Sequence, residues 1–162
     1  PDWAPDGETI LFQVYGSREG FARLRLVDGA SLEFSAIPGS DFAHWSPVGR
    51  TIVYHAPDGL RVLHVDSGVD TLVVSNIRDD AEAFYAAWSP DGSKLYYLTR
   101  SPERWSIRSV PARGGASTVL VNFDDPTRQQ TKYGLCTDGK VFYFTIGSPE
   151  SDIWVAQLQG AR

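Results

Sequence analysis

The sequence predicts an all-β fold, a β-propeller of about four blades built from four-stranded antiparallel sheets, on three observations. First, a short motif, Trp-Ser-Pro-Asp-Gly or a near copy, recurs at residues 3–7, 45–49, 88–92 and 136–139. Second, the four copies begin 42, 43 and 48 residues apart, and a period of about 40–45 residues is typical of a propeller blade. Third, each period holds apolar stretches broken by Gly, Pro and Asp, with no helical periodicity.

The motif explains how each unit begins. In its third copy, Pro90 presets φ at the second turn position, and Gly92 supplies backbone angles that a Cβ atom disfavours. A stretch rich in β-branched and aromatic residues follows each turn and reads as a strand. These strands are expected at residues 8–14, 50–55, 93–99 and 140–146.

Each unit then continues through a second hairpin to a short outer strand. Pro, Gly and small polar residues fill the second loop of every unit, as such turns require. Third strands are expected at residues 23–27, 60–65, 105–110 and 153–158, and outer strands at residues 31–34, 71–74 and 117–121. Many of these strands are apolar on both faces, which is expected for a sheet packed between two neighbours.

The repeat organises the whole chain, residues 1–162, as one propeller segment with units at about 1–41, 42–84, 85–132 and 133–162. We expect the first unit to lack its innermost strand, because only two residues precede Trp3, and the fourth to stop after its third strand. Propellers hide their end strands, since exposed strand edges invite pairing. The chain is therefore expected to be a segment or half of a larger ring, with copies that associate or the remainder of a longer parent chain completing it.

Composition limits the function classes. The chain of 162 residues is 42% hydrophobic and 12% aromatic, enough for a real core, and its net charge of −5 argues against nucleic acid as a partner. A single cysteine excludes an intrachain disulfide framework and a thiolate zinc cluster. No run of about 18 apolar residues is present, so we expect no membrane insertion by this segment. No cofactor is expected.

The residues also resemble a known family. The Trp-Ser-Pro-Asp-Gly turn at 88–92, the strands ending near Asp28 and Asp66, and the strand around Trp154 resemble the WD-like propeller repeat of TolB-type proteins. Two departures are Val48 in place of the motif's Asp and Cys136 in place of its Trp. The resemblance implies a bacterial, extracytoplasmic or periplasmic binding or sensing platform. Its closing stretch is most similar to the propeller part of receptor-like kinases and regulators.

Acidic residues gather before the inner strands. Their loops are expected to meet at one rim of the central channel, where carboxylates could attract a cation or a basic peptide. The alternative is that they are solvated turn residues, because Asp is common in turns. The candidates are Asp41, Asp79, Asp80, Glu82, Asp124 and Asp125.

The longest connection between blades, residues 122–133, is the second candidate for recognition. Long loops on a rigid scaffold often carry binding residues. Arg128, Lys132 and Tyr133 could offer planar or charged donors and an aromatic ring to a protein or peptide. Alternatively, Tyr133 begins the next inner strand and packs between blades, as we expect for Phe42 and Tyr85.

Other motif residues are assigned structural roles. Trp3, Trp45 and Trp88 recur at one repeat position, which favours packing over carbohydrate stacking. The glycines of the same turns are Gly7, Gly49, Gly92 and Gly139.

Histidines and catalytic motifs give little sign of chemistry. His44, His55 and His64 lack the short spacing of a metal-binding motif, which favours hydrogen-bonded structural roles. No Gly-x-Ser-x-Gly nucleophile elbow is present. We therefore expect a noncatalytic scaffold that binds a protein, peptide or ligand and closes its ring by self-association. The alternative is a regulatory or substrate-gating propeller of a larger hydrolase or kinase.

Overall fold

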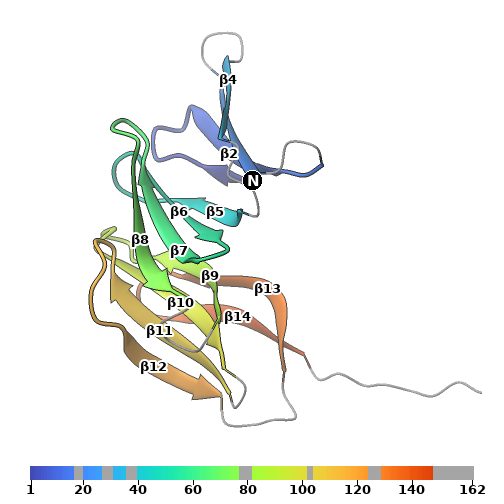
Figure 1. Cartoon of the computed structure of the whole chain (residues 1–162), viewed down its shortest axis with the longest axis vertical. Coiled ribbons are helices and arrows are strands. Elements are labelled where there is room, and N and C mark those ends of the chain that lie inside the picture. Colours follow the sequence, from blue (N-terminus) through green and yellow to red (C-terminus); the bar gives the residue numbers. More distant parts are fainter. Residues whose placement is uncertain are drawn as a thin grey trace, which may run out of the picture.

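The computed structural model describes residues 1–16, 20–26, 31–35, 40–76, 82–101, 104–123 and 129–147, which form β-strands and turns. Figure 1 shows the strands gathered into sheets that follow one another along an arc. The first sheet contains β1 (Asp2–Trp3), β2 (Thr9–Val14), β3 (Gly20–Arg25) and β4 (Ser31–Ser35). The second contains β5 (Asp41–Trp45), β6 (Thr51–Ala56), β7 (Gly59–His64) and β8 (Val69–Ser75). The third contains β9 (Glu82–Trp88), β10 (Lys94–Arg100), β11 (Trp105–Pro111) and β12 (Thr118–Phe123), and the fourth β13 (Gln129–Thr137) and β14 (Phe142–Gly147).

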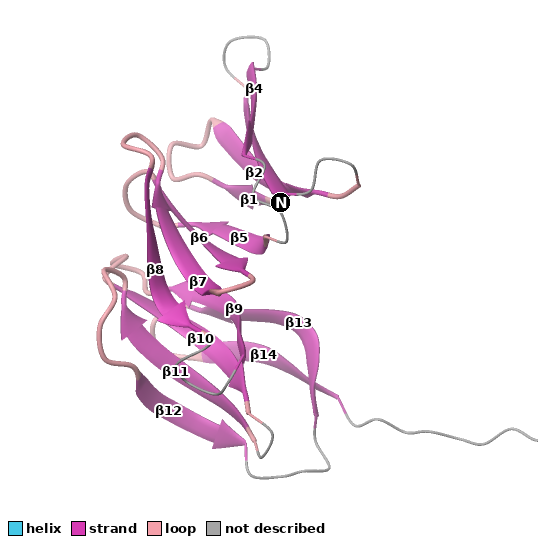
Figure 2. Ribbon diagram, in the orientation of Figure 1, coloured by secondary structure: helices cyan, strands magenta, loops and turns pink. Residues whose placement is uncertain are grey.

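Each sheet is an antiparallel meander in which strands neighbouring in sequence pair in space. Figure 2 shows strand as the only regular secondary structure drawn for the described residues. The strand order β5-β6-β7-β8 recurs as β9-β10-β11-β12 in the third sheet. This arrangement confirms the predicted all-β fold of successive four-stranded blades.

The expectation that the first unit lacks its innermost strand is wrong. Asp2 and Trp3 form β1, which pairs with β2 through Asp2 with Leu11 and Trp3 with Ile10. A strand of two residues is held because the Asp2 side chain also bonds the next sheet, where Oδ2 accepts from the Trp45 backbone amide at 2.7 Å. The third strand expected in the fourth unit, at residues 153–158, lies outside the described residues.

The repeated turn keeps the same glycine conformation in every unit. Its glycine lies in the left-handed region, with φ between 68° and 88° in the four copies, where a side chain would be strained. In the third copy, Asp91 accepts hydrogen bonds from the Ser93 amide at 3.1 Å and the Ser89 hydroxyl at 2.6 Å. Asp6 and Asp138 accept amide hydrogen bonds in the same way in their own turns. Because the Asp oxygens bond backbone donors, they fix the turn and the start of the following strand.

Core residues lie mainly between the sheets. Alternate positions of each second strand face opposite neighbours, as the period of two in a strand requires. One cluster joins the first and second sheets through Leu11, Phe21, Trp45, Ile52 and Tyr54. The next joins the second and third sheets through Val53, Leu60, Trp88, Leu95 and Tyr97, and the last joins the third and fourth through Leu98, Ile107 and Leu135.

The solvent exposure of the motif's first residue differs between units. Trp45 and Trp88 are 6% and 8% exposed, whereas Trp3 is 55% exposed. Cys136 is exposed as well, and it pairs with Tyr143 on the face opposite the one where Leu135 joins the core. The fourth turn lacks the motif's proline, so the strand pairing slips by one residue, and such a slip turns a side chain to the other face of a sheet.

Candidate channel-facing site

The innermost strands of the second, third and fourth sheets are bulged. In β5, residues 42–43 oppose the single residue Tyr54, and in β9, residues 85–86 oppose Tyr97. The pairing of β13 shifts between Gln130 and Leu135. Bulges bend a strand and re-aim its side chains, and they recur next to binding and active sites.

Phe42 and Tyr85 occupy the bulges of neighbouring sheets at the same repeat position. Both have a left-handed backbone, with φ of 50° and 40°, which is uncommon for aromatic residues. Their rings lie 4.3 Å apart between centroids, at an interplanar angle of 57°. The expectation that these residues pack between blades is confirmed. Phe42 nevertheless remains 37% exposed, so the pair presents aromatic surface outside the core.

His44 and Asp2 lie beside this pair on the inner strands. His44 Nδ1 is 3.6 Å from Asp2 Oδ2, and both side chains are partly exposed. Burial raises the pKa of Asp2, but hydrogen bonds from His44 and from the Trp45 amide outweigh it, and the pKa of the carboxyl lies below its usual value. Asp2 is therefore held as a carboxylate at neutral pH.

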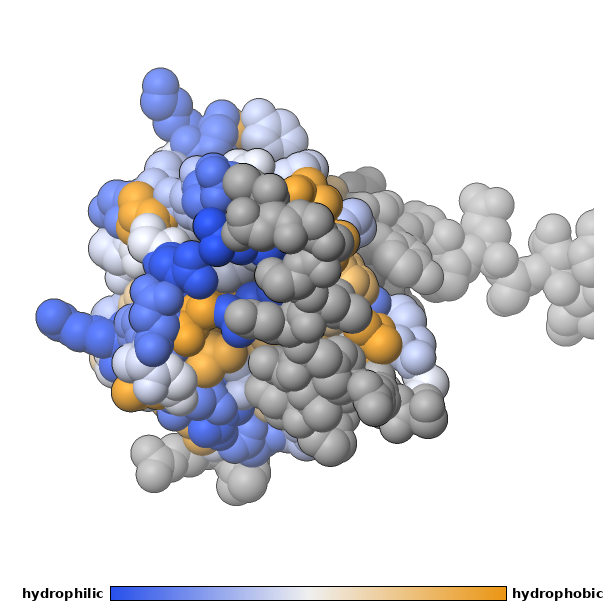
Figure 3. Space-filling view, turned by 90° about the horizontal axis from the view of Figure 1, so that it is seen from above, coloured by the Kyte–Doolittle hydropathy of each residue, from blue (hydrophilic) through white to orange (hydrophobic). Residues whose placement is uncertain are grey.

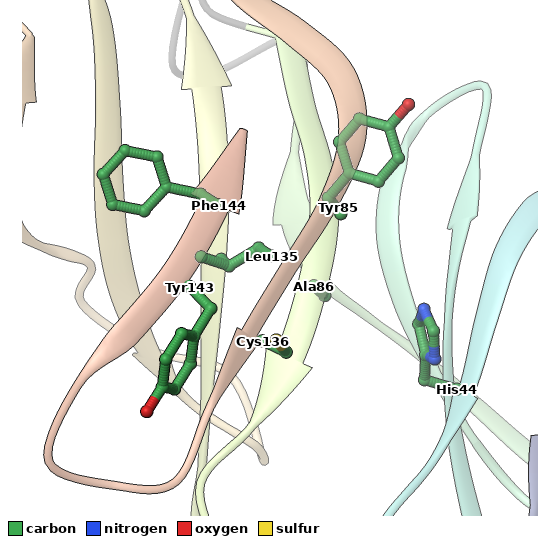
Figure 4. Close-up of a pocket in the computed structure, with 8 residues that line it drawn as sticks. His44, Tyr85, Ala86, Leu135, Cys136, Tyr143 and Phe144 are labelled. Atoms are coloured by element: carbon green, nitrogen blue, oxygen red, sulfur yellow. The ribbon is translucent and has the colours of Figure 1, made fainter. Parts of the chain in front are cut away.

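Two hollows meet at His44. The larger, of about 430 Å³, is lined by Tyr85, Ala86, Leu135, Cys136, Tyr143 and Phe144 together with His44 and Gly134. Figure 4 shows His44 on the neighbouring sheet, beside the strands that carry the other lining residues. The smaller hollow, of about 170 Å³, includes Asp2, Gln13, Tyr15 and Phe42 in its lining. The volume of the larger hollow falls within the size range of small-ligand pockets, about 300–1,000 Å³.

A second group of side chains lies where β5 and β9 begin. Asp41 Oδ1 is 2.8 Å from His55 Nδ1, and the His55 ring stacks on Phe84 with centroids 5.9 Å apart. Arg100 lies 5.8 Å from the ring centroids of Phe84 and of Trp105, close enough for a cation–π interaction. Charged and aromatic side chains therefore form a continuous strip across the second and third sheets.

Comparisons with known proteins agree with this architecture. No protein-family model matches the chain, and no curated protein matches it. Among solved structures, a protein assigned as TolB from Agrobacterium tumefaciens matches 75% of this chain with a TM-score of 0.63 and 15% identity. TolB from Acinetobacter baumannii matches 69% with a TM-score of 0.56 and 20% identity. The chain has a TolB-like β-propeller fold.

A third solved structure extends the comparison. The structure of oligogalacturonate lyase in complex with manganese matches 75% of this chain with a TM-score of 0.61 and 15% identity. The matched part covers 48% of the Agrobacterium protein, 29% of the Acinetobacter protein and 39% of the lyase. The chain thus spans about half or less of the length of these structures. Its described ranges contain no helix with the length and hydrophobicity that a membrane span requires.

The predicted rim carboxylates of the TolB-like propeller are only partly described. Asp41 and Glu82 are the first residues of β5 and β9. Each is paired within its own sheet, Asp41 with His55 and Glu82 with Arg100 at 3.3 Å. Both are therefore strand residues that have a partner on the adjacent strand. Asp79, Asp80, Asp124, Asp125 and Arg128 lie outside the described residues, and for Lys132 and Tyr133 only the backbone in β13 is described.

The three histidines lie apart. His44 faces Asp2, His55 faces Asp41, and His64 Nδ1 lies 3.2 Å from the Thr51 hydroxyl. Within the described ranges, no three His, Cys, Asp or Glu side chains are grouped so that they could hold a metal ion.

Sequence reasoning missed the role of the inner-strand residues. Phe42 and Tyr85 were predicted to pack, but their left-handed backbone was not, and neither Asp2 nor His44 was assigned to a channel site. The sequence did contain one sign that the two aromatic residues are equivalent, because each precedes the motif tryptophan of its unit by three positions. No sequence pattern would have revealed the hydrogen bond from the Trp45 amide to Asp2.

Proposed function

We propose that this TolB-like propeller is a noncatalytic interaction module whose inner strands bind a peptide segment of a protein partner. The observation that carries the proposal is the pair of aromatic residues, Phe42 and Tyr85, on left-handed bulges of adjacent inner strands. Left-handed backbone at non-glycine residues costs about 1–3 kcal/mol each and is concentrated at functional sites. Aromatic side chains at the centre of an interface commonly dominate its binding energy.

The surroundings suggest the character of the bound segment. The larger hollow is lined mainly by apolar and aromatic side chains, so an apolar side chain of the partner would fit it. Asp2 is held as a carboxylate beside the smaller hollow, and the chain carries a net charge of −5. A peptide with a basic residue next to an apolar or aromatic one fits both features.

A second candidate function has its own support. The chain spans only about half or less of the structures that it matches, and one of those is an enzyme, oligogalacturonate lyase. A regulatory or substrate-gating propeller of a larger hydrolase or kinase would fit that relation. Such a role predicts a catalytic sequence adjoining this segment, whereas the chain alone should not cleave oligogalacturonate in the presence of Mn²⁺.

A selection of random peptides displayed on phage, with this chain as the immobilised target, tests the proposal. Synthetic versions of the selected peptides are then titrated against variants by fluorescence anisotropy. Phe42→Ala and Tyr85→Ala should each weaken binding at least about tenfold, as expected for aromatic hot-spot residues. Leu120→Ala, at an exposed apolar position of the outer strand β12, is the control and should leave affinity unchanged. Failure to select any peptide, or equal binding to all variants, contradicts the proposal.

A further inference from the structure

The second and third blades repeat one set of three polar residues, which begins with a tyrosine and an arginine. The tyrosines, Tyr54 and Tyr97, each stand nine positions after the motif tryptophan of their blade. Each pairs with an arginine on the next strand, Tyr54 with Arg61 and Tyr97 with Arg108. In both blades, the pairing with the outer strand shifts directly before this arginine. The two arginines therefore occupy equivalent places.

The third member of the set differs between the two blades. Asp70 comes two residues before the outer-strand partner of Arg61, and Ser117 comes two residues before that of Arg108. Asp70 Oδ2 accepts hydrogen bonds from the tyrosine hydroxyl of its blade at 2.7 Å and from Arg61 Nε at 3.1 Å. Ser117 Oγ lies 2.6 Å from the tyrosine hydroxyl of the third blade and accepts from Arg108 Nε at 3.1 Å. A hydroxyl thus takes the place that a carboxylate has in the second blade.

This exchange changes the charge around the arginine. Arg61 has a second carboxylate partner as well, because its Nη1 donates to Asp58 Oδ2 at 2.6 Å. Among the residues that the structure describes, no carboxylate pairs with Arg108, which is partly buried. The outer loops differ in the same sense, since residues 65–70 contain two aspartates whereas residues 112–117 contain an arginine and no acidic residue. A partly buried guanidinium is stabilised most by an anion, because hydrogen bonds between charged groups are the stronger ones.

Charged residues as such are common on this molecule. Seen from the end of the first sheet, hydrophilic residues and hydrophobic patches alternate over the described surface (Figure 3), so a single charge does not mark a site. The difference between equivalent positions is more specific. The first blade has Phe12, Ala22 and Leu32 at the three places, which carry no charge to neutralise. The third blade keeps the arginine without its aspartate, which leaves a place for an anion from another molecule.

The outer edge of β12 lies beside this arginine. β8 and β12 are the last strands in the order of their sheets and lie on the outer side of the arc (Figure 1). An outer strand presents backbone donors and acceptors, and charged residues or proline usually protect such an edge. β8 contains Asp70, whereas β12, with the sequence Thr-Val-Leu-Val-Asn-Phe, contains neither a charge nor a proline. Val119 pairs with Arg108, so it shares its face, and it is 43% exposed.

We propose that an extended, acidic segment of a protein partner adds to the edge of β12 and places a glutamate or aspartate carboxylate on the terminal nitrogens of Arg108. The contact of Asp58 with Arg61 Nη1 shows the geometry that this carboxylate would adopt. A residue on the added strand lies two strand spacings, about 10 Å, from Arg108, a distance that an arginine and a glutamate side chain cover together. Main-chain pairing along β12 provides affinity, and the ion pair selects acidic segments. This surface does not depend on the proposed function.

A carboxylate supplied within the chain tests the charge at this position. In Ser117→Asp, the new carboxylate takes the place that Asp70 has in the second blade. Ser117→Asn is the control, because its side chain has the same shape and no charge. At pH 7, the urea midpoint of Ser117→Asp should exceed that of Ser117→Asn, and the difference should vanish when Arg108→Gln is added to both. Equal midpoints, or a difference that persists with Arg108→Gln, overturn the proposal.

A phage-displayed library of peptides with a fixed central glutamate and random neighbours supplies the binding probe. Peptides that bind the immobilised chain are synthesised and titrated by fluorescence anisotropy. Replacement of the central glutamate by glutamine should weaken binding at least about tenfold, and so should Arg108→Gln and Ser117→Asp in the chain. Arg104→Gln, which removes the same charge from an exposed position, is the control and should change affinity less than about twofold.

The remaining outcomes separate the β12 edge from the channel-facing site. Failure to select peptides that need Arg108, or equal affinity of the glutamate and glutamine forms, overturns the acidic partner. If a second copy of this chain covers β12 instead, light scattering should show a dimer that Arg108→Gln does not change, which also overturns it. Phe42→Ala should leave these acidic peptides bound, and Arg108→Gln should leave the peptides of the channel-facing site bound. Each proposal can therefore fail while the other stands.

Discussion

Removal of the Trp88 side chain is the most informative single test of how the sheets are joined. The indole is 8% exposed, lies in the cluster with Val53, Leu95 and Tyr97, and donates a hydrogen bond to the His44 carbonyl. Trp88→Ala therefore removes packing and a polar contact at one junction while leaving the turn that follows intact.

The size of the effect follows from the buried area. A tryptophan that buries about 200 Å² contributes about 5 kcal/mol at 25 cal/mol per Å², and a compact unfolded state reduces this to about 3–4 kcal/mol. Loss of the indole donor leaves the His44 carbonyl without it and adds about 1 kcal/mol. The free energy of unfolding should therefore fall by about 4–5 kcal/mol, a large share of the 5–15 kcal/mol typical of a domain.

Urea denaturation followed by far-ultraviolet circular dichroism measures this difference without relying on tryptophan fluorescence. The matched control is Trp3→Ala, studied at a concentration where light scattering shows single chains. Because Trp3 is 55% exposed, its loss should cost no more than about 2 kcal/mol. Equal losses for the two variants, or a loss below about 1 kcal/mol for Trp88→Ala, would refute the packing argument.

Two further predictions concern backbone and charge. Gly59→Ala should destabilise the fold far more than Gly68→Ala in the same urea assay, although both glycines have positive φ. An added Cβ at Gly59 would lie 1.9 Å from the Val74 carbonyl oxygen, whereas an added Cβ at Gly68 would meet open space. Equal losses of stability in the two variants would contradict this argument. The Ser89 hydroxyl is the main cause that holds the pKa of Asp91 at about 2, so Ser89→Ala should raise this pKa toward 3.8 in a carboxyl NMR titration, and an unchanged midpoint would refute the assignment. Because the folded pKa is depressed, the stabilisation by this carboxylate is present above the unfolded pKa and is lost as pH falls toward 2.

The sequence predicted the blades well because their signals are local. Turn glycines and Asp caps act within a few residues, so the positions of β2, β6 and β10 follow from the motif that precedes each of them. β1 was missed because its two residues are too short for a strand pattern, and a bond to the second sheet holds it in place. The orientation of Cys136 was missed because a shorter turn changes the pairing register, which depends on geometry across two strands.

The candidate site was harder to predict because its parts come from different blades. Phe42 and Tyr85 meet only through the packing of two sheets, and the pairing of Asp41 with His55 depends on the register of β5 on β6. The sequence pattern placed Asp41 and Glu82 in the loops before the inner strands, whereas the structure makes them the first residues of β5 and β9. Their partners could not be read from spacing, because each lies on the next strand at a sequence distance that differs between the two units.

The burial of Trp45 and Trp88 by the preceding sheet has a consequence for biosynthesis. A ribosome releases the chain from its N-terminus, and domains and repeats can fold as they emerge. The surface that receives each tryptophan is therefore already complete when that residue leaves the exit tunnel. Nascent blades would add one by one onto a finished template, which shortens the time for which large aromatic side chains are available to chaperones or to other unfolded chains.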